Sequence, residues 1–306
     1  MSEWIGVAFA VASSVLGGSA AAVTRYLAVG ADPIALAVVR FGLGFLIVAP
    51  IAMFSRLRWP PRGDWLGISA LGILFFALAT VLYNVALGYT TAARATLALS
   101  TLPFMTMIVG ALFGVERTSI RKVVGVVVAM VGVGVALATG AGNAPPGAWR
   151  GEVLMLGTSF CMSLYNVWSR PFIERSSALA FLTVGMGAGA IALVIASSFV
   201  SDMHQVAEFI STNWIASLYL ALGGGALAFI LWILALQRAT PTRVAVTITL
   251  NPISAALLAT VLLNEPLTWS LIVGLLAILA GIGIVASSSV DQTRVVPRES
   301  AEGSDR

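Results

Sequence analysis

The chain has 306 residues, of which 59% are hydrophobic and only 10% are charged, and its formal net charge is +4. Soluble domains carry about 25% charged residues, so a water-facing surface cannot be built from so few charges and lipid must cover most of this protein. The small basic excess does not indicate nucleic-acid binding, and the single cysteine, Cys161, excludes a disulfide within the chain. The composition therefore predicts an all-α integral membrane protein.

Ten uncharged stretches follow one another along the chain, and the second is interrupted by Arg40. Each is long enough, or nearly so, to cross a hydrocarbon core of about 30 Å as a helix. The first continues past the length of a signal-peptide core and has no basic residue before it, so we expect a retained spanning helix. The stretches are 4–24, 34–55, 65–93, 95–115, 123–142, 153–169, 176–201, 209–237, 244–264 and 266–290.

The distribution of Arg and Lys predicts the orientation of these spans. An even number of spans puts both termini on one side, and the loops and tail on that side hold 13 of the 17 basic residues. Loops rich in Arg and Lys stay in the cytoplasm. We therefore expect a multi-pass protein of the inner (cytoplasmic) membrane with both termini cytoplasmic.

Two parts of the chain repeat each other 149 residues apart. An Arg, a Pro and a Glu recur in the same order, and 21 uncharged residues separate the Arg from the Glu in each copy. Five spans per half is an odd number, so the second half must cross the membrane in the opposite direction. This predicts two inverted-topology five-helix repeats around a central cavity, the arrangement of many transporters. The matched residues are Arg94, Pro103 and Glu116 in the first copy and Arg243, Pro252 and Glu265 in the second.

The boundaries of the repeats follow from local composition. We expect the first repeat over 1–140 and the second over 148–290, joined by a Gly/Pro-rich loop that cannot continue a helix. The tail, 291–306, is polar and charged, and we expect it to be cytoplasmic and disordered. Small residues recur in spans five and ten, which favours close helix packing. The choice between a monomer and a homodimer stays open.

The two repeated prolines lie inside spans four and nine. Each removes a backbone hydrogen bond, so a kink or break is expected at Pro103 and Pro252. One interpretation is a packing kink; the other, which the recurrence favours, is a hinge beside the substrate cavity.

Polar side chains at helical spacing predict the faces that line this cavity. Ser159, Ser163 and Asn166 share one face of span six, and a shift of 145 residues places Ser14 and Gly18 at matching positions of span one. Faces of spans three and four map onto spans eight and nine at a shift of 149. For any single Ser or Thr, a hydrogen bond to its own helix is the alternative. The predicted substrate-binding residues are Ser14, Gly18, Thr80, Tyr83, Thr96, Ser100, Ser159, Ser163, Asn166, Phe229, Trp232 and Thr249.

The sequence offers little for catalysis. No metal, phosphate or nucleophile motif is found, so we expect neither an enzyme nor a bound cofactor or metal. No carboxylate lies at the centre of a span, which predicts facilitated diffusion or exchange, or at most weak proton coupling. Glu152 is the nearest candidate proton site, with an interfacial position as the alternative. Arg40, inside span two, could bind a substrate carboxylate, or it could hold the span by pairing with Asp32 or helix-end carbonyls.

Three segments of the chain contain sequence motifs that are similar to those of a known protein family. They are Asp32-Pro33 with Arg40-Phe41, Pro103 with Gly114-Val115-Glu116-Arg117, and Asn251-Pro252 with Asn264-Glu265-Pro266. In these motifs the chain resembles the EamA-type permeases of the drug/metabolite transporter superfamily. The resemblance implies ten helices in two inverted repeats, a central cavity formed mainly by spans one, three, four, six, eight and nine, and alternating access. The second half lacks the Asp-Pro…Arg element, so a symmetric role for Arg40 is not expected.

These observations predict an inner-membrane transporter that exports amino acids, aromatic or neutral, or related small metabolites. Among EamA-type relatives, the YddG-type aromatic amino acid exporters are the comparison that we favour. The aromatic residues Tyr83, Phe229 and Trp232 fit an amino acid substrate but do not select it. One alternative is a carrier for drugs or nucleotide sugars. An alternative of another class is a non-transporting receptor or scaffold. The expected partners are a small-molecule substrate and the lipid bilayer, without nucleic acid.

Overall fold

The computed structural model describes residues 2–28, 32–115, 120–139, 144–200 and 210–263, with a few single positions between 269 and 280. These residues form helices and the turns between them, with no strand in the ranges given. Several predicted features lie outside the described residues: Glu116 and Glu265, residues 140–143 of the joining loop, most of the tenth span and the tail 291–306.

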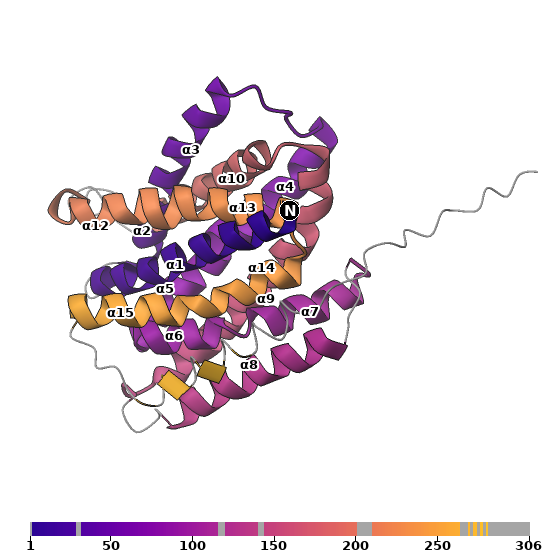
Figure 1. The fold of residues 1–306 in the computed structure, drawn as a ribbon. Helices are drawn as coiled ribbons and strands as arrows, with labels where there is room; N and C mark the ends of the chain where they lie inside the picture. Colours follow the sequence, from indigo (N-terminus) through magenta and orange to yellow (C-terminus); the bar gives the residue numbers. More distant parts are fainter. Residues whose placement is uncertain are drawn as a thin grey trace, which may run out of the picture.

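The first half of the chain contributes five spans to the bundle (Figure 1). Span one is a single helix, and spans two and three each contain a π-helical segment between two α-helical parts. Span four is broken into two helices. The elements are α1 (Ser2–Ala28); α2 (Pro33–Ala37), η1 (Val38–Gly42) and α3 (Leu43–Phe54); η2 (Arg62–Asp64), α4 (Trp65–Gly72), η3 (Ile73–Ala79) and α5 (Thr80–Tyr89); α6 (Ala92–Leu99) and α7 (Leu102–Leu112); and α8 (Ile120–Thr139).

The second half repeats this pattern over the residues described, except that span seven lacks the π-helical segment of span two. Spans six and seven are uninterrupted helices, span eight contains a π-helical segment, and span nine is broken by a short 3-10 turn. The elements are α9 (Ala148–Arg175); α10 (Ala178–Val200); α12 (Trp214–Tyr219), η5 (Leu220–Leu227) and α13 (Ala228–Arg238); and α14 (Pro241–Thr247), η6 (Ile248–Leu250) and α15 (Asn251–Leu263).

Seven helical segments in the described ranges are long enough and apolar enough to cross a membrane. They coincide with the first four predicted spans and with spans seven, eight and nine, while α8 and α9 occupy the places of spans five and six. The segments are Glu3–Ala28, Pro33–Phe54, Arg62–Tyr89, Ala92–Leu112, Ala178–Phe199, Trp214–Arg238 and Pro241–Leu263.

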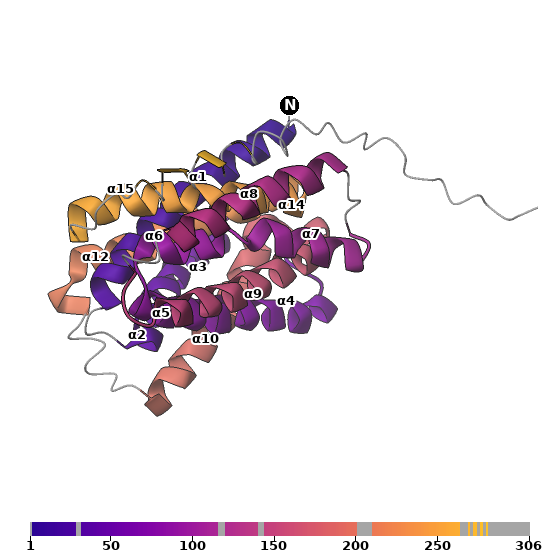
Figure 2. The same cartoon turned by 90° about the horizontal axis from the view of Figure 1, so that it is seen from below.

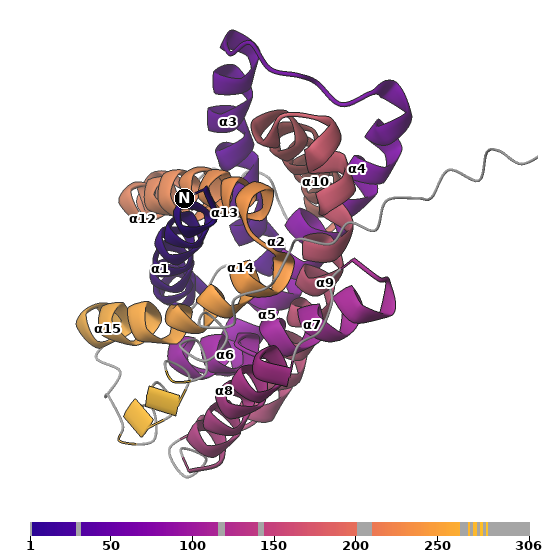
Figure 3. The ribbon, with the colours of Figure 1, turned by 45° about the vertical axis from the view of Figure 1, so that its right-hand side comes forward.

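The two halves exchange their first spans. α1 packs along α13 and α15 of the second half, and α9 packs along α5, α6 and α7 of the first half. Figure 2 shows α9 beside α5 and α7, and Figure 3 shows α1 enclosed between α13 and α15. The second spans follow the same rule, because α3 packs on η5 and α10 packs on α4 and η3. Each half therefore completes the core of the other, and the interface between them runs through the centre of the bundle.

Both repeated prolines begin a new helix. α6 ends at Leu99 and α7 begins at Leu102, so Pro103 is the second residue of its helix; Pro252 has the same place in α15, after the 3-10 turn. Proline fits the first turn because its missing N–H would find no partner within the helix there. Each span therefore changes its helical hydrogen bonding just before its proline, through a turn in span four and a 3-10 turn in span nine, while it continues across the bundle as one helical segment. The hinge role of Pro103 and Pro252 stays a prediction.

The π-helical segments of spans three and eight also repeat. Shifted by 149 residues, η3 covers residues 222–228 and overlaps most of η5. π-helical turns are rare and concentrate at functional sites, where an extra residue in the turn redirects side chains. Sequence periodicity did not predict them, and both lie next to the cavity described below.

Candidate functional site

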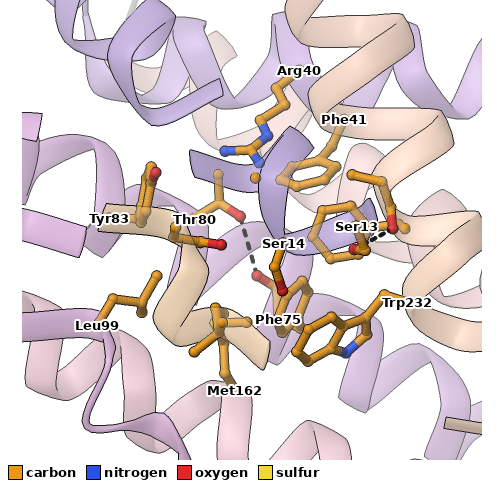
Figure 4. Close-up of a pocket in the computed structure, with 15 residues that line it drawn as sticks. Ser13, Ser14, Arg40, Phe41, Phe75, Thr80, Tyr83, Leu99, Met162 and Trp232 are labelled. Atoms are coloured by element: carbon orange, nitrogen blue, oxygen red, sulfur yellow. Dashed lines mark hydrogen bonds between the residues drawn. The ribbon is translucent and has the colours of Figure 1, made fainter. Parts of the chain in front are cut away.

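A small central cavity of about 60 Å³ lies between the two halves (Figure 4). Its wall combines aromatic rings with a few hydroxyl groups, one amide and one guanidinium, and it draws on spans one, two, three, four, six, eight and nine. The lining residues are Ser13, Ser14, Gly17, Arg40, Phe41, Phe75, Thr80, Tyr83, Leu99, Met162, Ala228, Phe229, Trp232, Ile248 and Asn251.

Two hydrogen bonds between the halves, one in the cavity wall and one outside it, repeat the internal symmetry. Ser13 Oγ donates to the carbonyl oxygen of Ala228 at 2.7 Å. Thr158 Oγ1 lies 3.4 Å from the carbonyl oxygen of Ala79 and shares its hydrogen with the carbonyl oxygen of Leu154 in its own helix, at 3.1 Å. Ser13 and Thr158 are 145 residues apart, and Ala79 and Ala228 are 149 apart. In both cases a hydroxyl group on the first span of one half contacts a carbonyl oxygen on the third span of the other half. That carbonyl lies at the end of the π-helical segment of the third span. The carbonyls near a π-helical segment thus receive partners from the opposite repeat.

The aromatic wall is a connected cluster. The ring centroids of Phe41 and Phe75 each lie 5.2 Å from that of Phe229, and Phe75 lies 4.5 Å from Tyr165. The two contacts of Phe229 are edge-to-face, whereas Phe75 and Tyr165 are tilted by 32°; aromatic pairs at these distances contribute beyond simple burial. Phe41 and Phe75 were not among the predicted substrate-binding residues.

The reason for missing Phe75 is geometric. Thr80 Oγ1 donates to the carbonyl oxygen of Phe75 at 3.2 Å, five residues earlier. Positions five apart do not share a face of a regular α-helix. The π-helical segment η3 brings them together, so a search at α-helical spacing could not pair them.

The match with known proteins decides the family. The model of the EamA-like transporter family matches residues 4–138 and again residues 149–287. This chain belongs to the EamA-like transporter family. The predicted fold class, an all-α membrane protein of two inverted five-helix repeats, is confirmed with it, and the protein is a membrane transporter.

Relatives of this EamA chain span most of its length. An uncharacterized transporter of Archaeoglobus fulgidus is 25% identical over 291 residues, covering 93% of this chain and 99% of its own. A probable amino-acid metabolite efflux pump of Salmonella typhimurium is 28% identical over 251 residues, covering 79% and 83%. One solved crystal structure has a TM-score of 0.69 and 20% identity, covering 92% of this chain and 95% of that one, which shows the shared fold.

The predicted substrate-binding residues of the EamA chain fall into two groups. Ser14, Thr80, Tyr83, Phe229 and Trp232 line the central cavity. The remaining seven lie beside it, mostly buried in helix contacts: Gly18, Thr96, Ser100, Ser159, Ser163, Asn166 and Thr249.

Most hydroxyl groups of the second group bond to backbone carbonyls. Thr96 donates to Ala92, Ser100 to Thr96, Ser163 to Phe160 and Thr249 to Val246, all within one turn. These are the local bonds that Ser and Thr commonly make in helices. Ser159 instead donates to Leu99 of span four at 3.2 Å, and so joins the two repeats.

Arg40 lies in the wall of the cavity and is bonded to the other half. Its Nε donates to the carbonyl oxygen of Gly224 in η5 at 3.1 Å, and its guanidinium lies 5.2 Å from the ring of Phe41 and 5.7 Å from that of Tyr83. Asp32 caps α2, accepting from the N–H groups of Ile34 and Ala35. The sequence predicted Asp32 or helix-end carbonyls as partners of Arg40. The partner of its Nε in the structure is a backbone carbonyl, that of Gly224 in the π-helical segment η5.

A larger groove of about 820 Å³ opens near the end of α1, between α1, α12 and α15. Close contact of α1 with α15 separates it from the central cavity: a Cβ on Gly18 would lie 2.1 Å from Ser254 Oγ and 2.3 Å from the Asn251 carbonyl oxygen. Beside this contact Ser19 and Tyr219 share a hydrogen bond. The contact lies between residues that line the cavity and residues that line the groove.

Proposed function

We propose that this transporter exports amino acids, aromatic or neutral, or closely related small metabolites, by alternating access. The observation that carries the proposal is the central cavity, which lies between two exchanged repeats and joins an aromatic wall to a few polar groups. A polar head with an apolar side chain matches such a wall. Alternating access is the motion that inverted repeats make available around a site at their interface.

The Salmonella relative supports the substrate class. It is named a probable amino-acid metabolite efflux pump, and it aligns with 79% of this chain. A drug or nucleotide-sugar carrier is the second candidate. Among the described residues of the wall, Arg40 is the only basic one, whereas a nucleotide sugar brings two phosphate charges.

Flux through purified protein tests the proposal. Proteoliposomes loaded with labelled phenylalanine, threonine or methionine should show saturable efflux that empty liposomes lack. Trp232→Ala, which removes a ring from the cavity wall, should weaken phenylalanine efflux more than threonine efflux. Absence of efflux for all three solutes, from protein that remains monodisperse, would reject the amino acid assignment.

A further inference from the structure

The central cavity holds a cation without an anion. Arg40 is 7% exposed, and within the described part of the chain it forms no ion pair with Asp or Glu. Its Nε is bonded to Gly224, and the end of the guanidinium points toward the cavity beside Tyr83 (Figure 4). A buried charge is costly unless an opposite charge meets it. The cavity therefore favours an anionic group placed against Arg40.

One side chain of the cavity wall carries a buried acceptor for which the described residues supply no donor. Asn251 is 4% exposed, lines the cavity from α15, and its Oδ1 has no hydrogen-bond partner among the described residues. Buried polar atoms in native proteins nearly always have a partner, so an unsatisfied one calls for an explanation. An ammonium group brings three donors and would satisfy this oxygen.

We infer that Arg40 and Asn251 form the head-group site for a zwitterion. The guanidinium binds a carboxylate, Asn251 Oδ1 accepts from the ammonium group, and the aromatic wall takes the side chain. Arg40 comes from the first half and Asn251 from the second, so a bound zwitterion connects the two repeats. The inference rests on the proposed function and narrows it to solutes that carry both charges.

Competition with single-charge analogues tests the site. The assay measures counterflow of labelled phenylalanine in the presence of one of three unlabelled competitors. These are phenylalanine itself, phenylalaninol, which lacks the carboxylate, and 3-phenylpropionate, which lacks the ammonium group. In the parent protein phenylalanine should inhibit best. Arg40→Gln should reduce the advantage of phenylalanine over phenylalaninol by about tenfold, the scale of a charge-assisted hydrogen bond. Asn251→Ala should reduce its advantage over 3-phenylpropionate.

Arg25→Gln is the matched control. Arg25 also donates to backbone carbonyls, those of Leu87 and Gly88, but it does not line the cavity. Its loss should leave the order of the three inhibitors unchanged. Equal weakening of all three by Arg40→Gln would show a purely structural arginine and overturn the site. Absence of counterflow in the parent would instead reject the amino acid function.

A second inference comes from two ion pairs that join the halves at their repeated arginines. Arg94 Nη2 lies 2.6 Å from Glu152 Oε1, and Arg243 pairs with Glu3. Each arginine lies in the first turn of a broken span, α6 or α14, and each glutamate lies near the start of a first span, α9 or α1. At the shift of 145 residues Glu152 aligns with Val7, one helical turn from Glu3 and on the same face.

The two pairs lie at opposite ends of the bundle. Gly6 of α1 packs against Arg238 and Ala239, next to the start of α14, whereas Gly151 of α9 packs against Ala86 and Thr90, next to the start of α6. In Figure 1 the N-terminus lies at the end where α14 begins, and α6 begins at the other end. Both pairs are formed together in this structure, with the central cavity between them.

The geometry points to these two pairs as latches of transport, one at each membrane face. A further ion pair between the halves, Arg175 with Asp64, joins the end of α9 to the start of α4 and does not involve a repeated arginine. Opening the face where α6 begins requires the Arg94 pair to separate, and opening the face where α14 begins requires the Arg243 pair to separate. This inference rests on alternating access and not on the identity of the substrate. With the orientation predicted from the basic loops, the Arg94 pair closes the outer face and the Arg243 pair the inner face.

Cysteine labelling tests the latches without any substrate. Met162, which lines the cavity, is replaced by Cys in a Cys161→Ser background, and an impermeant maleimide is added from one side of oriented proteoliposomes. Arg94→Gln and Glu152→Gln should each raise the labelling rate only from the side where α6 begins. Arg243→Gln and Glu3→Gln should raise it only from the other side. A rise of about fivefold is expected for a partly buried ion pair.

Two further variants decide the interpretation. Exchanging the charges, with Arg94→Glu and Glu152→Arg together, should restore the parental rate. Glu174→Gln is the control, because the Arg170–Glu174 pair lies within one helix and joins nothing across the halves. A rise from both sides, or from neither, would overturn the latches. If a single variant does not fold, crosslinking Arg94→Cys to Glu152→Cys serves instead, and it must abolish labelling from that side alone.

Discussion

Trp232 donates its indole N–H to Asn166 Oδ1 across 3.0 Å, and this bond fixes one side of the aromatic cavity. Trp232 is 3% exposed and Asn166 is fully buried, on spans eight and six. A hydrogen bond from the indole N–H can hold a large ring in a single orientation within an apolar interior. The bond makes Asn166 a support for the cavity wall, although it does not line the cavity itself.

Trp232→Phe should destabilise the protein because it leaves the Asn166 oxygen buried without its donor. A loss of about 1–3 kcal/mol is expected for such an unsatisfied group. The measurement is unfolding of the purified protein in detergent. Adding Asn166→Leu to Trp232→Phe should recover part of the loss; simple addition of the two effects would show that the bond contributes nothing.

Gly18→Ala should separate α1 from α15. The added Cβ would lie 2.3 Å from the backbone oxygen of Asn251 and 2.8 Å from its Cα, and backbone atoms cannot move aside. We expect a lower melting temperature and wider access to the cavity from the side of the groove. Gly157→Ala is the matched control, since its nearest contact, Leu82 Cδ1 at 3.7 Å, is ordinary. Equal melting temperatures for the two variants would contradict the packing argument.

Pro103→Ala should reduce transport with little loss of stability. Alanine restores an N–H group and favours a continuous helix from α6 into α7, which removes the break beside the cavity. The expected result is a lower maximal flux from protein whose melting temperature is unchanged or higher. Pro252→Ala should act in the same direction. Unchanged flux in both variants would show that the breaks are features of packing only.

Efflux should be insensitive to a pH gradient. Of the acidic residues described, none lines the central cavity, and Glu152 is paired with Arg94. Without an acidic residue in the cavity, proton and substrate have no shared site there. Efflux rates with and without an imposed gradient should therefore agree within about twofold, a difference of less than about 1 kcal/mol. A rate that follows the gradient would assign the proton to a residue outside the cavity, with Glu152 tested first.

Many features of the two repeats could be predicted from the sequence. Charges and apolar length placed the spans, since the bilayer imposes a fixed thickness on every helix. The recurrence of Arg94 and Pro103 as Arg243 and Pro252 gave the two halves, and the structure shows both prolines at the start of a helix and both arginines in ion pairs across the halves. Glu3 and Glu152 were not predicted as the partners of these arginines. The first spans of the two halves align at a shift of 145 residues, and even at that shift Glu152 falls one helical turn away from Glu3.

The sequence alone determined the class of the protein: a membrane bundle of two repeats, the spans that form it, and five of the residues that line its cavity. Only the tertiary structure decided which polar groups face that cavity. A hydroxyl on the right helical face can satisfy itself on its own backbone, as Thr96 and Ser163 do. The π-helical turns, which bring Phe75 beside Thr80, form where the exchanged helices of the other half supply partners for the displaced carbonyls, and a one-dimensional pattern does not record that packing.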